Sequence, residues 1–412
     1  MRGARLGFYA IAALIIASPS IALSLDSTTT LPARINSPQL RMGTISGVGE
    51  RYVSNGSLVS LSDHYSMEFD SNTLSSVEPR IKQLVEVLNQ FGKQEMGSAL
   101  NLGTLKIDTR PDVRYMAPLH AYGITSKWTV AVGLPIVEYK NDIQISSSGS
   151  NLSSIRSQVY GVSPELDEAF DELEGVDLTD RARTELSTKG YKPLESRDET
   201  IIGDVQLANL YRVYSNSRFS VLSRTLLNLP TGPGDDPDDL ADLAMFGQTY
   251  IEEAAIANYQ LFNRLRLSAK AAYRFNLENS VVKRVPKNEK DTLPDADTKE
   301  DVRRKVGDTI TIGSGFSLEV INRWFAGAAY EVSQKLADQY TGSKSSKYDL
   351  LSKDTNSEAH RMRLGLTYDS TTAYQRKEAW LPAMISYEYS DTIRGLNIER
   401  QTIHEIWLTL FF

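Results

Sequence analysis

The chain lacks cysteine altogether, which excludes disulfide scaffolds and thiolate metal sites. Beyond its first 22 residues it also lacks any apolar stretch near the roughly 18 residues that a membrane-spanning helix needs. Its mean hydropathy is negative, so a helical membrane protein is excluded. A formal net charge of −7 over 412 residues gives none of the basic excess that nucleic-acid binding requires.

Imidazole groups are scarce as well. Enzymatic hydrolysis needs a positioned nucleophile and a base, and the four histidines stand outside any recognisable catalytic motif: His64, His120, His360 and His404. We therefore expect no enzyme, and we expect neither a cofactor nor a metal ion.

The first 22 residues have the pattern of a secretory signal. Arg2 and Arg5 precede an apolar run over 6–17, and small residues follow, with a cut expected after Ala22. An exported chain without spanning helices can cross a membrane only as a closed β-barrel, because lipid leaves no other way to satisfy the backbone. Residues 23–51 are rich in Ser and Thr and show no periodicity in their first half, so we expect a periplasmic lead-in or hatch there and the barrel over 52–412.

The last twelve residues read QTIHEIWLTLFF. Ile406, Leu408 and Leu410 fall on one face of an extended strand, because strand side chains alternate between two faces. The segment resembles the closing strand of bacterial outer-membrane β-barrels. That resemblance implies that the terminal Phe412 is an assembly signal.

The same period of two recurs through most of the chain. Alternating segments of about ten residues, with one apolar face and one polar or small face, are typical of a barrel with lipid outside and a polar lumen. In the first of them we expect Tyr115, Ala117 and Leu119 on the apolar, outer face and Arg114 inside. The clearest segments are 115–121, 128–136, 205–213, 219–229, 265–275, 310–320 and 362–368. A soluble β-sandwich would alternate in the same way.

The connections favour the barrel. Tight turns alternate with long polar segments, a rhythm that periplasmic turns and extracellular loops produce and that a sandwich does not. We therefore predict an all-β, transmembrane antiparallel β-barrel of about 12 strands, beginning at 52–69, with aromatic girdles at both interfaces and short helices in the N-terminal region and the extracellular loops. The tight turns are 124–127, 215–217, 262–264 and 321–323; the long segments are 142–200, 230–248, 278–308 and 336–358.

Two segments have helical periodicity instead. Ser76 is a candidate N-cap for a helix with apolar residues at Ile81, Leu84, Val85 and Leu88. Within the long 145–199 loop, Ser163 is a second candidate N-cap and Thr179 a third. Between them Leu166, Phe170 and Leu173 form an apolar stripe, which fits either a lid folded into the barrel mouth or a surface helix.

Two charged loops complete the extracellular side. The run 229–239 places four aspartates among Pro and Gly, and without the spacing of a calcium loop we interpret it as a solvated acidic loop. The segment 282–305 alternates basic and acidic residues and reads as a mobile loop. The alternation is weakest in the strand expected at 249–261, because the adjacent Glu252 and Glu253 place a charge on each of its two faces.

Charged side chains on the polar face of the strands are the candidate functional residues. They can form a structural salt-bridge network across the bore, or a charged lining that screens what passes. The candidates are Arg212, Arg224, Arg266, Lys270, Arg274, Glu319, Glu331, Arg363, Glu388 and Glu405.

Three short motifs carry a family resemblance. They are AYGITSKW at 121–128 running on through Val130 to Pro135, Gly203-Asp204-Val205 leading to Tyr211-Arg212, and LPTG at 229–232. These resemble the outer-membrane proteins of the phenol-degradation meta-pathway family, which is loosely related to the long-chain fatty-acid and toluene transporters. The plug motif of the fatty-acid transporters is missing, and the acidic 145–199 loop is longer than the resemblance leads us to expect.

The resemblance implies passive uptake of small hydrophobic, including aromatic, compounds across the bacterial outer membrane. Its implied partners are the lipid bilayer, lipopolysaccharide, the barrel-assembly machinery and the solute. Two alternatives stay open: a non-transporting surface barrel whose loops mediate binding or outer-membrane stability, and an open diffusion porin, for which about twelve strands leave little bore.

Overall fold

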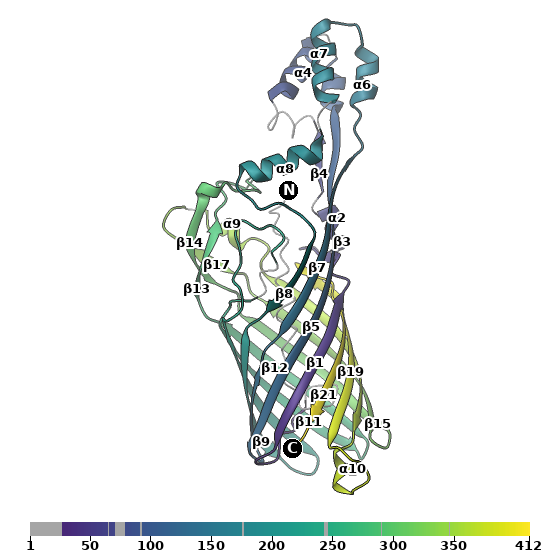
Figure 1. Ribbon diagram of the computed structural model, residues 1–412, viewed down its shortest axis with the longest axis vertical. Helices are drawn as coiled ribbons and strands as arrows, with labels where there is room; N and C mark the ends of the chain where they lie inside the picture. Colours follow the sequence, from purple (N-terminus) through teal and green to yellow (C-terminus); the bar gives the residue numbers. More distant parts are fainter. Residues whose placement is uncertain are drawn as a thin grey trace.

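A computed structural model describes residues 27–64, 66–70, 79–90, 93–174, 177–242, 246–289, 291–345 and 347–412, so the expected signal peptide lies outside the described residues. Within them, twelve antiparallel strands form one closed barrel (Figure 1). Closure follows because the first strand pairs with both the last strand and β5. The barrel strands are β1 (Asn36–Ser46), β5 (Asn101–Thr125), β6 (Trp128–Gly133) continued by β7 (Ile136–Ser148), β8 (Arg197–Ile202) continued by β9 (Val205–Ser215), β10 (Phe219–Leu229), β11 (Tyr250–Phe262), β12 (Leu265–Asn276), β15 (Thr309–Ile321), β16 (Trp324–Lys335), β18 (Ser357–Asp369), β19 (Ala383–Leu396) and β21 (Thr402–Leu410).

The predicted alternation of short and long connections is confirmed. Two- to three-residue turns close β5 to β6, β9 to β10, β11 to β12 and β15 to β16 at the end of the barrel where the C-terminus lies. The β18 to β19 link at that end carries a small helix, α10 (Thr371–Gln375). Every long connection emerges at the opposite end, so that end is the extracellular one. No helix in the described part of the chain is long and apolar enough to cross a membrane.

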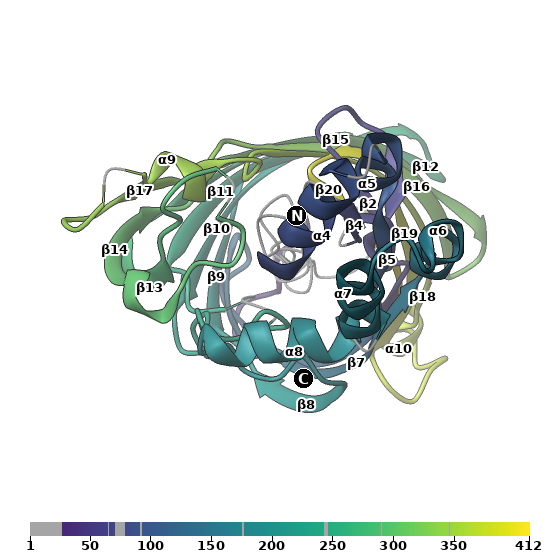
Figure 2. The same ribbon diagram turned by 90° about the horizontal axis from the view of Figure 1, so that it is seen from above.

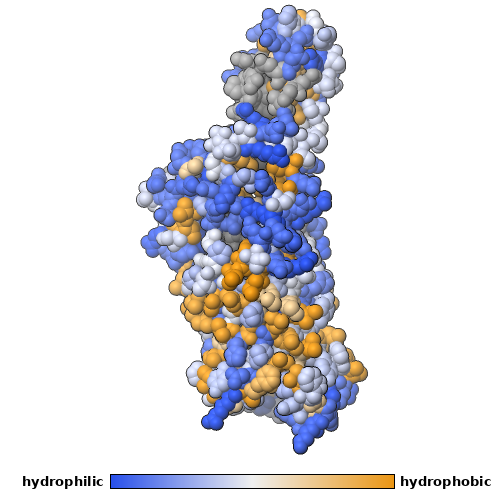
Figure 3. Space-filling view, in the orientation of Figure 1, coloured by the Kyte–Doolittle hydropathy of each residue, from blue (hydrophilic) through white to orange (hydrophobic). Residues whose placement is uncertain are grey.

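The outer surface of the barrel carries an apolar band, which Figure 3 shows over the lower half of the molecule. Leu364 and Leu366 of β18 are about two-fifths exposed, as is Leu267 of β12, and Ile406 of β21 is nearly half exposed. Toward the turns, aromatic side chains stand side by side, as in the tilted pair Trp324 and Tyr368 with centroids 5.2 Å apart. This is the lower of the two predicted girdles, where an amphipathic ring has one side in lipid and one in water.

The predicted first strand is wrong. β1 begins at Asn36, inside the segment expected to be a periplasmic lead-in, and its whole length pairs with β21 and β5. The predicted strand 52–69 instead divides into short elements above the extracellular rim. They are β2 (Glu50–Tyr52), β3 (Leu58–Ser60), α2 (Leu61–His64) and β4 (Met67–Asp70), and β2 pairs with β20 (Ile398–Glu399).

The predicted facing of β5 is also wrong. Tyr115, Ala117 and Leu119 are buried on the inner face, whereas Met116 is 40% exposed on the outer face and Arg114 is exposed as well. Both faces of this segment carry apolar side chains, so hydropathy does not distinguish them. Tyr115 faces inward, where its hydroxyl group donates a hydrogen bond to the carboxylate of Glu405.

Helices gather at the tip of the long β5–β7 hairpin, far above the barrel in Figure 1, and Figure 2 shows them from above. The four are α4 (Pro79–Gln90), α5 (Gln94–Ala99), α6 (Leu152–Val159) and α7 (Pro164–Glu174). Ser163 caps α7 as predicted, accepting a hydrogen bond from the Leu166 amide at 3.2 Å. The next helix, α8 (Leu178–Thr188), lies beside the barrel mouth, and its N-cap is Asp177, not Thr179. Ser76 lies outside the described residues.

The two charged loops are folded onto each other, which corrects the expectation of a solvated and a mobile loop. Residues 279–305 contain β13 (Asn279–Arg284), η1 (Ala296–Thr298) and β14 (Lys299–Lys305), and β14 also pairs with β17 (Gln339–Thr341). The aspartates of 235–239 pair with cations from 192–299. The pairs are Asp235 with Lys283, Asp236 with Lys192, Asp238 with Arg284 and Lys299, and Asp239 with Arg197.

Candidate functional site

A chain of alternating charges, with residues from four strands, runs across the inner face of five neighbouring barrel strands. Lys270 Nζ of β12 lies 2.9 Å from Glu331 Oε1 of β16, and the same oxygen accepts a hydrogen bond of 2.8 Å from Arg363 Nη1 of β18. Arg363 also binds both carboxylate oxygens of Glu388 on β19, at 2.7 and 3.0 Å. A fork with two parallel N–H···O bonds fixes orientation as well as charge, so Arg363 is held on two sides.

A second group lies on the neighbouring strands. Glu252 of β11 accepts from Arg224 of β10 at 2.8 Å and from Arg274 of β12 at 2.8 and 3.1 Å. The Arg274 guanidinium also stacks over the Tyr250 ring, 4.2 Å from its centroid. Arg224 is only 1% exposed. Such a charge is tolerated only when it is paired, because removing it from water is costly.

The third group joins the two ends of the barrel sheet. Arg41 of β1 and the Tyr115 hydroxyl of β5 both donate to Glu405 of β21, which is 2% exposed. Trp407 of β21 donates its indole N–H to the same carboxylate and carries the Arg41 guanidinium over its ring at 4.4 Å. The closing seam of the barrel is therefore bridged on its inner face by side chains as well as by the backbone.

Three of the ten predicted inner-face residues lie apart from these groups, near the periplasmic turns. Arg212 donates to the Ser126 carbonyl, and Arg266 donates to the Gln260 side chain at 3.4 Å. Glu319 accepts a hydrogen bond of 3.4 Å from the Arg323 backbone N–H. The structure thus brings the other seven together in the three groups above: Arg224, Lys270, Arg274, Glu331, Arg363, Glu388 and Glu405.

The members of these groups that sequence reasoning missed include Arg41, Tyr115 and Glu252. Arg41 falls in the segment 23–51, for which we expect a periplasmic lead-in and no barrel strand, and the sequence pattern places Tyr115 on the outer face. Glu252 did carry a signal, because two adjacent glutamates must point to opposite faces of a strand. Glu253 points outward and accepts from Ser223 Oγ and Thr225 Oγ1, both at 2.6 Å.

The described N-terminal segment runs inside the barrel before β1 begins. The Thr28 amide donates to Asn258 Oδ1 of β11 at 2.9 Å, and the Leu31 amide donates to Thr129 Oγ1 of β6 at 2.8 Å. Leu31 is 1% exposed and packs among inner-face residues that include Ala131 and Leu222. The segment is therefore fixed against the inner wall near the periplasmic end.

The apolar stripe, for which both a lid and a surface helix were considered, does not lie in the barrel mouth. Leu166, Phe170 and Leu173 are buried in the core of the helical tip, where they pack with Leu84 and Leu88 of α4. Phe412, the expected assembly signal, is 59% exposed, and its backbone exchanges hydrogen bonds with Asn36, the first residue of β1.

Two of the short sequence motifs meet at the extracellular rim around Asp204, which is 3% exposed. Its carboxylate accepts from the Gly232 amide at 2.8 Å, from Asn228 Nδ2 at 2.8 Å and from the Gly247 amide at 3.0 Å. Thr231 Oγ1 accepts the Val205 amide at 2.8 Å. The motifs at 203–205 and 229–232 are therefore joined by hydrogen bonds, which stabilise the interruption between β8 and β9.

Comparison with known proteins gives one family and a set of solved structures. The family model described as "Putative MetA-pathway of phenol degradation" matches residues 89–377. No curated protein matches the chain. An outer-membrane channel from Pseudomonas putida F1 has a similar structure, with TM-score 0.51 and 11% identity over 95% of this chain and 100% of that chain. At this identity the likeness shows a shared fold.

Two further solved structures resemble the chain at lower scores. The monoaromatic hydrocarbon channel CymD gives TM-score 0.35 and 11% identity, covering 97% of each chain. The toluene transporter TbuX from Ralstonia pickettii gives TM-score 0.33 and 11% identity, covering 93% of this chain and 90% of that chain.

Proposed function

Because the chain belongs to the family described as a putative MetA pathway of phenol degradation, we propose that it is a passive outer-membrane channel for small hydrophobic compounds, aromatic ones included. The barrel fold, which the chain shares over 95% of its length with the Pseudomonas putida outer-membrane channel, supports the proposal. The family description supplies the link to aromatic compounds. A transport channel needs no catalytic group, and we propose none for this chain.

The observation that carries the proposal is the construction of the barrel interior. In a twelve-stranded barrel inward side chains take up much of the cross-section. Here five cations and four carboxylates, together with the Thr28–Leu31 segment, occupy the inner wall. Paired and fixed charges restrict the flow of hydrated ions, because a desolvated pair is costly to break. A narrowed bore of this kind fits selective passage of small solutes better than an open diffusion porin.

We propose that the ten inner-face residues line the lumen in two zones. The seven paired residues form the constriction at mid-height, and Arg212, Arg266 and Glu319 line the periplasmic exit. Phe412 serves in this proposal as the signal that the assembly machinery reads, and lipopolysaccharide surrounds the upper girdle.

A second candidate function is a non-transporting surface barrel. It is favoured by the ordered extracellular layer, in which the 235–239 aspartates are locked to cations from distant segments. Such a layer could present a binding surface without any transport.

Flux into proteoliposomes separates the two functions. The refolded barrel, reconstituted in liposomes, should accelerate entry of a poorly membrane-permeant phenol derivative over empty liposomes. A control variant in which a short linker replaces residues 149–196, and with them the extracellular helices α6, α7 and α8, should transport equally well if the lumen carries the function. No acceleration by the full-length barrel would contradict the channel and favour the surface protein.

A further inference from the structure

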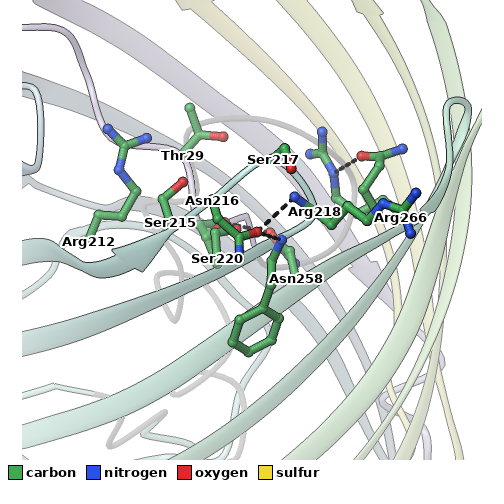
Figure 4. A pocket seen from close by; sticks show the side chains of 12 residues that line it. Thr29, Arg212, Ser215, Asn216, Ser217, Arg218, Ser220, Asn258 and Arg266 are labelled. Carbon is green, nitrogen blue, oxygen red and sulfur yellow. Dashed lines mark hydrogen bonds between the residues drawn. The ribbon is translucent and has the colours of Figure 1, made fainter.

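Three arginines surround one cavity at the periplasmic mouth of the barrel. Arg212 lies near the end of β9, Arg218 lies in the turn before β10, and Arg266 lies near the start of β12. The cavity has a volume of about 170 Å³. In Figure 4, Arg212 stands on one side of Thr29, and Arg218 and Arg266 stand on the other.

These arginines differ from those at mid-barrel in their partners. Arg41, Arg224, Arg274 and Arg363 each pair with a glutamate. Across the described part of the chain, no ion pair joins any of the three mouth arginines to a carboxylate. The hydrogen bonds of Arg212 and Arg266 go to neutral oxygens, of the Ser126 backbone and the Gln260 amide.

The rest of the cavity wall is neutral and polar. Apart from Phe219, the other lining residues carry hydroxyl or amide groups, and no acidic residue is among them. Thr28 and Thr29 belong to the N-terminal segment, and Thr28 is tied to the barrel by Asn258 at 2.9 Å and Ser220 at 2.5 Å. An occupant would therefore touch both the barrel wall and the segment that runs inside it.

We propose that this cavity binds the carboxylate of a small organic acid as it leaves the barrel for the periplasm. Guanidinium groups present planar forks of N–H donors that match a carboxylate, and the hydroxyl and amide groups add neutral donors. This inference rests on the proposed function, because only a conducting barrel delivers a solute to its periplasmic mouth. It narrows the solute class to small hydrophobic acids, with an aromatic monocarboxylate as the model ligand.

The test is isothermal titration of the full refolded barrel in detergent with three probes: benzoate, its neutral analogue benzyl alcohol, and inorganic phosphate. Benzoate should bind at one site, and benzyl alcohol and phosphate at least about tenfold more weakly. In R266Q and in R218Q the affinity for benzoate should fall by about tenfold or more. The matched control is R264Q, an exposed arginine of the same rim that does not line the cavity, and its affinity should not change.

Heat-modifiable gel migration identifies which variants are folded, and R218Q in the turn provides an independent case if R266Q does not fold. Equal binding of benzoate and benzyl alcohol would overturn the inference, and so would phosphate binding as tight as that of benzoate, or an equal loss in R264Q. A barrel that transports a neutral phenol derivative but does not bind benzoate contradicts this inference alone. A barrel that binds benzoate but transports nothing contradicts the proposed function alone.

Discussion

Lys270 and Glu331 form an ion pair of 2.9 Å although the strand β15 lies between them. The residue of β15 that stands opposite both is Gly313. A Cβ atom at this position would lie 2.9 Å from Glu331 Cγ, so the absence of a side chain is what allows the pair to form. The same arrangement recurs at the barrel seam, where Tyr115 reaches Glu405 across Gly43 of β1.

Filling the Gly313 position should separate the pair. In G313V the added side chain displaces Glu331 from Lys270 and breaks the buried ion pair between them. Breaking a buried pair in this way costs about 3 kcal/mol or more. Urea unfolding of the refolded barrel should show the loss, and S314V, on the outer face of the same strand, should show little change. Equal stability of the two variants would contradict the account.

Shortening a charged side chain of the network should widen the lumen. In Arg363→Ala the link between Glu331 and Glu388 is lost, and in Glu405→Ala the seam residues Arg41 and Tyr115 lose their shared carboxylate. We expect both variants to insert normally and to show a higher single-channel conductance in planar bilayers. Glu319→Ala is the control, because Glu319 faces inward outside the paired groups. Unchanged conductance in both network variants would refute the constriction.

Charges on the lipid face should act on assembly instead. Leu364 and Leu408 point outward, and an arginine at either position costs about 2–4 kcal/mol near the bilayer midplane. Leu364→Arg and Leu408→Arg should lower the fraction of heat-modifiable, membrane-inserted barrel, whereas Leu364→Phe should not. If the two arginine variants insert normally while Arg363→Ala fails to insert, the inner and outer faces are assigned the wrong way round.

The extracellular layer should respond to acid. Burial raises the pKa of Asp238, but hydrogen bonds from Lys299 and Arg284 more than offset this, so the pKa lies below its ordinary value. A carboxyl group with a lowered folded-state pKa stabilises the fold above its unfolded-state pKa, and this contribution is lost as the pH falls through the folded-state value. The layer should therefore loosen below about pH 4.

Asp238→Asn should reproduce that loosening at neutral pH. The expected readout is faster hydrogen exchange in 230–242 and 279–289, the two segments that Asp238 and Arg284 join. Asp180→Asn is the control, since the ion pair of Asp180 with Arg183 is long, at 3.5 Å, and exposed. Identical exchange in the Asp238 variant and the native protein at pH 7 would show that the ion pairs do not hold the layer.

The barrel could be predicted because its strong signals are local. Alternation and link length are read from short stretches, and they assign strands such as 265–275 and 362–368 with the correct facing. β1 was not predicted because few of its outward residues are apolar. Pro38 is among the outward residues, and the inward residues include Ser37, Gln39 and Arg41. Such a strand is specified by its partners β21 and β5, which lie far away in the sequence.

The site was only half predictable for a related reason. The alternation of side chains along a strand predicts which charges face inward, but it does not predict which of them pair. The pairs here join residues up to 364 positions apart. The acidic loop shows the same limit. Asp235 to Asp239 look solvated in isolation, and their cations come from Lys192 to Lys299.

The most direct test of the central claim is the initial uptake rate of labelled small hydrophobic compounds by cells. A strain deleted for this protein should take up phenol and toluene at low concentration more slowly than the same strain carrying the native gene. Leu408→Arg, which is expected not to insert, should fail to restore uptake, and Leu364→Phe should restore it. Equal uptake of every hydrophobic compound by the deleted and complemented strains would contradict the claim that this barrel is an uptake channel.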